Sequence, residues 1–95
     1  MSVMLVHIDG LLGRIAHLAD QLGEDPDQHL HRAVLELREA FDDRRAIEPA
    51  FARMRETVRM LRRGELIRRR SGLDALDEVV ERELLPQLRR VGFDL

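Results

Sequence analysis

The strongest constraint in this chain is an apolar stripe near its N-terminus, where large side chains recur at steps of four and three residues. Its members are Met4, Ile8, Leu11, Ile15, Leu18 and Leu22. An α-helix completes a turn about every 3.6 residues, so this spacing places all of these side chains on one face. Such a face must be buried, and residues 3–22 therefore predict a helix that packs against other helices.

Two later segments with the same spacing predict further helices. The segment 26–42 follows a turn in which Asp25 can cap the helix and Pro26 can open it. The segment 49–63 opens at Pro49, and the alternative is one long helix kinked at that proline. Their inward stripes are Leu30, Val34, Leu37 and Phe41 in the first, and Ala50, Phe51, Met54, Val58 and Leu61 in the second.

The C-terminal third predicts a fourth helix over residues 74–91, preceded within residues 65–71 by a short helical turn or a continuation of the helix before it. We expect Ser71 and Gly72 to break the helical pattern and Pro86 to kink or interrupt the helix. Gly92 is expected to close it, since glycine adopts the left-handed conformation of many helix ends. The inward stripe is Leu73, Leu76, Val80, Leu84, Leu88 and Val91.

These helices predict an all-α fold, a compact bundle of about four main helices in one domain spanning residues 1–95. The chain holds no Trp or Tyr and only 3 Phe, which disfavours a strand-rich fold. Apolar residues that flank the main stripes suggest surface to spare for a second copy of the chain. Close approach of a second helix would also explain Gly10 and Gly13, although simple tolerance explains them equally well. The flanking residues are Leu5, Leu12, Ala19, Val79 and Leu85.

Composition excludes several classes of function. The chain has no cysteine, so it forms no disulfide and carries no thiolate nucleophile. A small domain without disulfides fits a reducing compartment, and we expect a cytoplasmic protein. No apolar run approaches the ~20 residues that span a bilayer, and residues 1–22 lack the features of a signal peptide. We therefore expect no membrane partner.

The most conspicuous polar feature is an arginine-rich segment over residues 53–70. One interpretation is that its arginines follow the phosphates of a nucleic acid. The other is that they pair with the chain's own acids, which follow at once from Asp74 to Glu83. The candidate residues for binding a partner or a nucleic acid are Arg55, Arg59, Arg62, Arg63, Arg68, Arg69 and Arg70.

No set of residues indicates a metal, a cofactor, a small-molecule substrate or catalysis. His29 and His31 lie two positions apart, so on a helix they point in different directions. The acids of residues 74–81 have helical spacing, but no Glu-x-x-His motif accompanies them, which argues against a di-iron site. Neither serine lies in a Gly-x-Ser-x-Gly turn.

The sequence thus predicts a small non-enzymatic interaction module, an adaptor, inhibitor or assembly subunit that acts through helix faces and charged strips. Its partner is expected to be another protein, a second copy of the chain, or both. The alternative is a nucleic-acid-binding accessory subunit that uses the arginine-rich segment 53–70.

Overall fold

A computed structural model describes residues 3–22, 29–64 and 67–95, with side chains described for residues 5–22, 29–64 and 72–95. Three helices come first: α1 (Val3–Gln21), α2 (His29–Asp43) and α3 (Ile47–Gly64). The last rod joins α4 (Ile67–Glu78), the π-helical segment η1 (Val79–Leu84) and α5 (Leu85–Arg90) end to end. These described ranges hold no strand, and the predicted all-α fold is confirmed.

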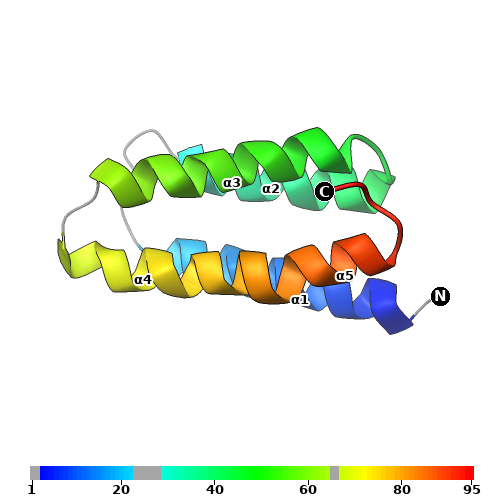
Figure 1. Cartoon of the computed structure of the whole chain (residues 1–95), viewed down its shortest axis with the longest axis horizontal. Coiled ribbons are helices and arrows are strands. Elements are labelled where there is room, and N and C mark those ends of the chain that lie inside the picture. Colours follow the sequence, from blue (N-terminus) through cyan, green and yellow to red (C-terminus); the bar gives the residue numbers. More distant parts are fainter. Residues whose placement is uncertain (1–2, 23–28, 65–66) are drawn as a thin grey trace.

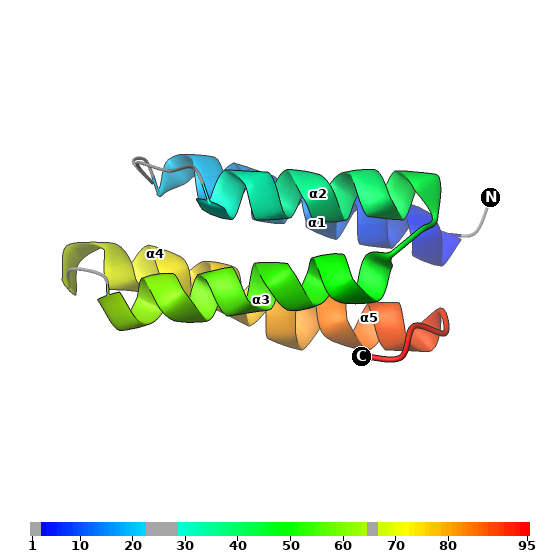
Figure 2. The ribbon, with the colours of Figure 1, turned by 90° about the horizontal axis from the view of Figure 1, so that it is seen from above.

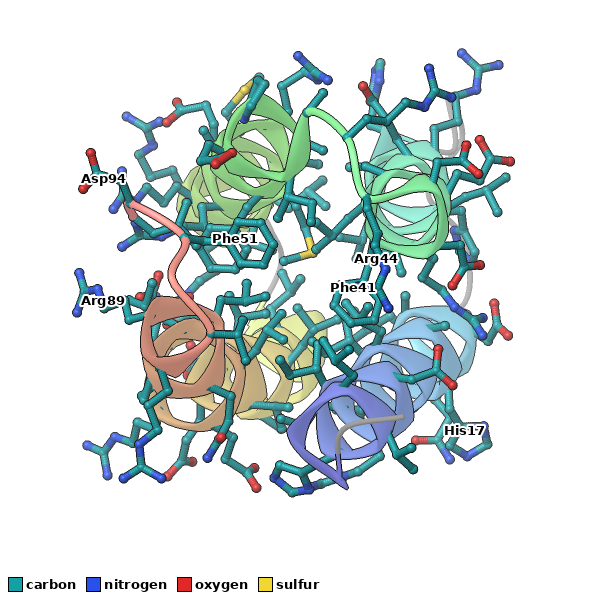
Figure 3. The ribbon with its side chains drawn as sticks, turned by 90° about the vertical axis from the view of Figure 1, so that its right-hand side faces the viewer. His17, Phe41, Arg44, Phe51, Arg89 and Asp94 are labelled. Atoms are coloured by element: carbon teal, nitrogen blue, oxygen red, sulfur yellow. The ribbon has the colours of Figure 1, made fainter. Side chains whose placement is uncertain are left out.

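The helices form an up-and-down bundle in which each rod runs against the one before it (Figure 1). Seen along the axis, α1, α2, α3 and the last rod occupy the corners of a square in that order (Figure 3). Seen from above, α1 lies beside α2, and α3 lies beside the last rod (Figure 2). The molecule measures 40 × 20 × 20 Å. The start of α1, the α2–α3 turn and the C-terminal residues lie together at one end of the bundle.

The core is built from the predicted stripes, and it also takes up the apolar residues that flank them. Leu12 and Ala19 of α1 are each only 1% exposed, and Val79 and Leu85 of the last rod are each 6% exposed. The expectation of surface to spare for a second copy was therefore wrong at these positions, because the chain covers them itself. No polar or charged residue is buried among the described side chains.

A short connection, residues 44–46, separates α2 from α3 as predicted, but Pro49 does not open the third helix. Helix α3 begins at Ile47, two residues earlier than predicted, and the chain reverses direction instead of forming one kinked helix. Two residues of the turn, Arg44 and Ala46, have positive φ angles of 55° and 46°. Pro49 then falls in the first turn of α3, where its missing N–H would have had no acceptor within the helix.

The expected break at Ser71 and Gly72 is absent, because α4 runs through both residues. A Cβ atom built on Gly72 would overlap Cδ2 of Leu22 at the end of α1. Glycine at this position therefore lets the two helices approach closely, and its weak helix propensity is offset by this packing.

The regular α-helix is interrupted just before Pro86, as predicted, but the last rod continues past it. The π-helical segment η1 precedes it, and the N–H of Leu85 bonds to the C=O of Val80, five residues earlier. Pro86 thereby falls in the first turn of α5, where a backbone donor is not needed. Gly92 closes the helix as predicted: its φ is +106°, and its N–H bonds to the C=O of Arg89.

Candidate functional site

The arginine-rich strip of α3 faces acidic residues of the last rod. Arg55 donates from Nε to Glu81 Oε1 at 2.8 Å and from Nη2 to Oε2 at 3.0 Å. Its guanidinium carbon also lies 5.6 Å from the centre of the Phe51 ring. The side chains of Arg55 and Glu81 are only 27% and 29% exposed. Both the edge and a face of this guanidinium are therefore engaged within the chain.

Arg62 makes a second bridge between the same two rods, nearer the end of α3. Its Nε lies 2.9 Å from Asp74 Oδ1 and its Nη1 lies 3.1 Å from Asp77 Oδ2. Because Arg62 and Arg55 are seven positions apart and both reach across to acids, together they hold α3 and the last rod in register.

The other predicted arginines differ in accessibility. Arg59 and Arg63 are 57% and 72% exposed and share Glu56 of their own helix, at 4.0 Å and 3.4 Å. The side chains of Arg68, Arg69 and Arg70 lie outside the described residues. The structure thus gives each of Arg55, Arg59, Arg62 and Arg63 an acidic neighbour within the chain, and none of these contacts tests binding to a partner.

The histidines and carboxylates do not form a metal site among the described residues, where no cluster of at least 3 His, Cys, Asp or Glu is found. His31 Nε2 instead lies 3.0 Å from Asp20 Oδ1, which links α2 to α1. Glu78 of the acidic series lies 3.5 Å from Arg82. These polar groups act as partners within the bundle.

A pocket of about 470 Å³ opens at the end of the bundle where α1 begins and the chain ends. We call it the end pocket. Its walls come from the start of α1, the end of α2, the start of α3 and the residues after α5, and most of them are apolar. The apolar lining residues are Leu5, Val6, Phe41, Ile47, Val91 and Phe93.

Three charged residues complete the lining of the end pocket: Asp9, Asp42 and Arg44. All three are exposed, and none has an ion-pair partner among the described residues. Figure 3 shows Arg44 beside Phe41, between α2 and α1. The pocket therefore combines an apolar floor with charges of both signs at its mouth, a combination typical of ligand and anchor sites.

The backbone around Arg44 explains why this side chain reaches the mouth. The N–H of Arg44 bonds to the C=O of Phe41 at 3.2 Å, and the N–H of Arg45 bonds to the C=O of Ala40 at 2.9 Å. These bonds form a Schellman turn, in which the residue in the left-handed conformation is usually glycine. Here it is an arginine with φ of 55°.

Sequence reasoning did not find the end pocket, because its walls come from three stretches far apart in the chain, residues 5–9, 41–47 and 91–93. Two weak signals were present. Phe41 and Phe93 are two of the 3 aromatic residues, and both line the pocket. The helix that ends near Asp42 also lacks a closing glycine, which singles out the residues that follow.

Comparisons with protein-family models, with curated proteins and with solved structures find no match to this chain. Within the described part of the chain, none of the helices combines the length and apolar character needed to cross a membrane.

Proposed function

We propose that this protein is a non-enzymatic interaction module, an adaptor, inhibitor or assembly subunit, whose protein partner inserts an apolar side chain into the end pocket. The observation that carries the proposal is the pocket itself, about 470 Å³ and lined mainly by aliphatic and aromatic side chains. Interfaces draw most of their affinity from a few anchors seated in such pockets. The cysteine-free composition leads us to place the module in the cytoplasm.

The surroundings of the pocket support a protein partner. Val6 lines the pocket and is 55% exposed, so the apolar floor continues onto the outer face of α1. The charged residues at the mouth would orient an approaching partner and make the complex sensitive to salt. The proposed module performs no chemistry on its partner.

Binding of nucleic acid through segment 53–70 is the weaker proposal. Arg55 and Arg62 are held by carboxylates on the last rod, so a phosphate would have to displace existing charge-assisted hydrogen bonds. Arg59 and Arg63 are more accessible. A filter-binding assay at low salt tests this proposal: affinity that falls steeply with salt and with Arg59→Ala plus Arg63→Ala would favour it.

The interaction proposal is tested with three matched variants. Val6, Leu35 and Met60 are similarly exposed, at 55%, 56% and 60%, but only Val6 lines the end pocket. An arginine at each position adds the same charge and bulk. We expect Val6→Arg to abolish the complex, whereas Leu35→Arg and Met60→Arg retain it.

The complex is recovered by affinity purification of the tagged protein from its native cells, followed by reconstitution with the purified partner. Sedimentation velocity on the isolated protein establishes whether the partner is a second copy. Loss of binding in all three variants, or in none, would contradict the assignment of the end pocket. An inert monomer that captures nothing would contradict the function.

A further inference from the structure

The mouth of the end pocket holds an arginine, Arg44, that has no ion-pair partner among the described residues, and this group specifies the anchor. Building on the function proposed above, we propose that the anchor is the C-terminal residue of a partner chain. Its apolar side chain occupies the pocket and its α-carboxylate binds Arg44, while its last amide N–H faces Asp9 or Asp42.

The backbone of Arg44 supports this inference. Its φ of 55° lies in the left-handed region, which side chains with a Cβ atom rarely adopt and glycine adopts freely. A glycine at this position would close α2 with less strain. Residues held in such conformations gather at ligand clamps, where the position of the side chain matters more than local strain.

Arg44 also differs from the neighbouring arginines. Arg45, the next residue, lies 3.2 Å from Asp43, and Arg53 pairs with Glu36. Arg44 lines the end pocket and has no acidic partner within the described part of the chain. Its planar guanidinium is therefore available for a carboxylate, which it can bind through two parallel hydrogen bonds.

The mixed charge of the mouth favours a peptide terminus over a simple aliphatic acid. Asp9 and Asp42 also line the pocket and would repel a bare carboxylate. A C-terminal residue brings an N–H donor within one residue of its carboxylate, so it can satisfy a guanidinium and an aspartate together. A fatty acid carries no N–H donor, so it cannot form a hydrogen bond to either aspartate.

The test uses three probes: acetyl-Ala-Ala-Leu with a free carboxylate, the same peptide as its C-terminal amide, and octanoate. Binding to the full chain is followed by the amide chemical shifts of residues around the pocket in two-dimensional NMR spectra. We expect the free acid to bind about tenfold more tightly than the amide. Octanoate should bind more weakly than the free acid.

Variants assign the effect to Arg44. Arg44→Gln should bring the affinities of the acid and the amide to within about twofold. The matched control, Arg45→Gln, should keep the tenfold difference, because Arg45 does not line the end pocket. Arg44→Gly should remove the difference in affinity between the acid and the amide and should also raise the midpoint of thermal unfolding. The higher midpoint would exclude misfolding as the cause of the lost preference. Asp9→Asn should strengthen octanoate binding relative to the free acid.

The outcomes separate this inference from the proposed function. Equal binding of the acid and the amide at the pocket would overturn the role of the carboxylate and leave an apolar anchor in place. Tighter binding of octanoate would replace the peptide terminus with an aliphatic acid. If no probe changed the amide chemical shifts around the pocket, the inference would be overturned. The proposed function would still be tested separately, by the effect of Val6→Arg on the partner complex.

Discussion

Alanine substitution at three helical glycines gives a direct test of how the helices pack. A Cβ atom added at Gly10 or Gly13 would meet no atom within 4 Å outside its own stretch of helix. The substitution should then bring the full gain in helix propensity, about 0.5–1 kcal/mol at each position. For a domain of this size, 1 kcal/mol corresponds to a rise in melting temperature of roughly 4–8 °C.

Gly72 should respond differently to the same change. The added Cβ would overlap Cδ2 of Leu22, so that side chain must move to another rotamer and give up part of its packing. Crowding of this kind costs roughly 1–3 kcal/mol in a packed site, and the flexible tip of a leucine places the cost near the lower end. We therefore expect Gly72→Ala to be at least about 1 kcal/mol less stabilising than Gly10→Ala.

The assay is urea unfolding followed by circular dichroism at 222 nm, with all variants compared at the same series of protein concentrations. Similar gains at all three positions would refute the close approach of α4 to α1. Destabilisation at Gly10 or Gly13 that grows with protein concentration would show instead that a second copy packs against α1, the alternative that these glycines raise in the sequence.

Three further predictions concern the core, the inter-helix bridge and the strained turn. Met54 is fully buried. In urea unfolding, Met54→Ala should lower the free energy of unfolding by about 2–5 kcal/mol, whereas Met54→Leu should lower it by less than about 1.5 kcal/mol. In a double-mutant cycle, Arg55 and Glu81 should show a coupling of about 1–2 kcal/mol, because the pair is bidentate and only about a quarter exposed; a coupling near zero would show that the bridge is not formed in solution. Arg44→Gly should raise the unfolding free energy by about 0.5–1 kcal/mol by relieving its left-handed backbone, and a loss of stability would show that the arginine contributes to the fold.

The arginine-rich segment illustrates what the sequence predicts about charged partners and what the structure adds. From the sequence, Arg62 was a candidate for phosphate and also for the acids that follow it. In the structure, Arg62 lies between Asp74 and Asp77 because α3 and α4 run antiparallel side by side. The spacing of charges along the chain allowed both sets of partners, and the pairing of the helices places Arg62 beside the acids.

The sequence by itself determined the helices and most of the core. The direction of a side chain on a helix depends on its position along 3.6 residues per turn, so Ile8, Leu37 and Val58 could be assigned to the interior from local spacing alone. The glycine that closes the last helix could be assigned in the same way. Such features depend on interactions between residues that are near one another in the chain.

Tertiary structure decided the features that depend on distant residues. Gly72 and Pro86 carry local signals for a break, but packing against Leu22 and a π-helical turn let the rod continue through both. The end pocket exists because the start of α1, the α2–α3 turn and the residues after α5 meet at one end. Local spacing carries no information about which distant segments will meet, and so the pocket, with Arg44 in its lining, emerges only in the folded bundle.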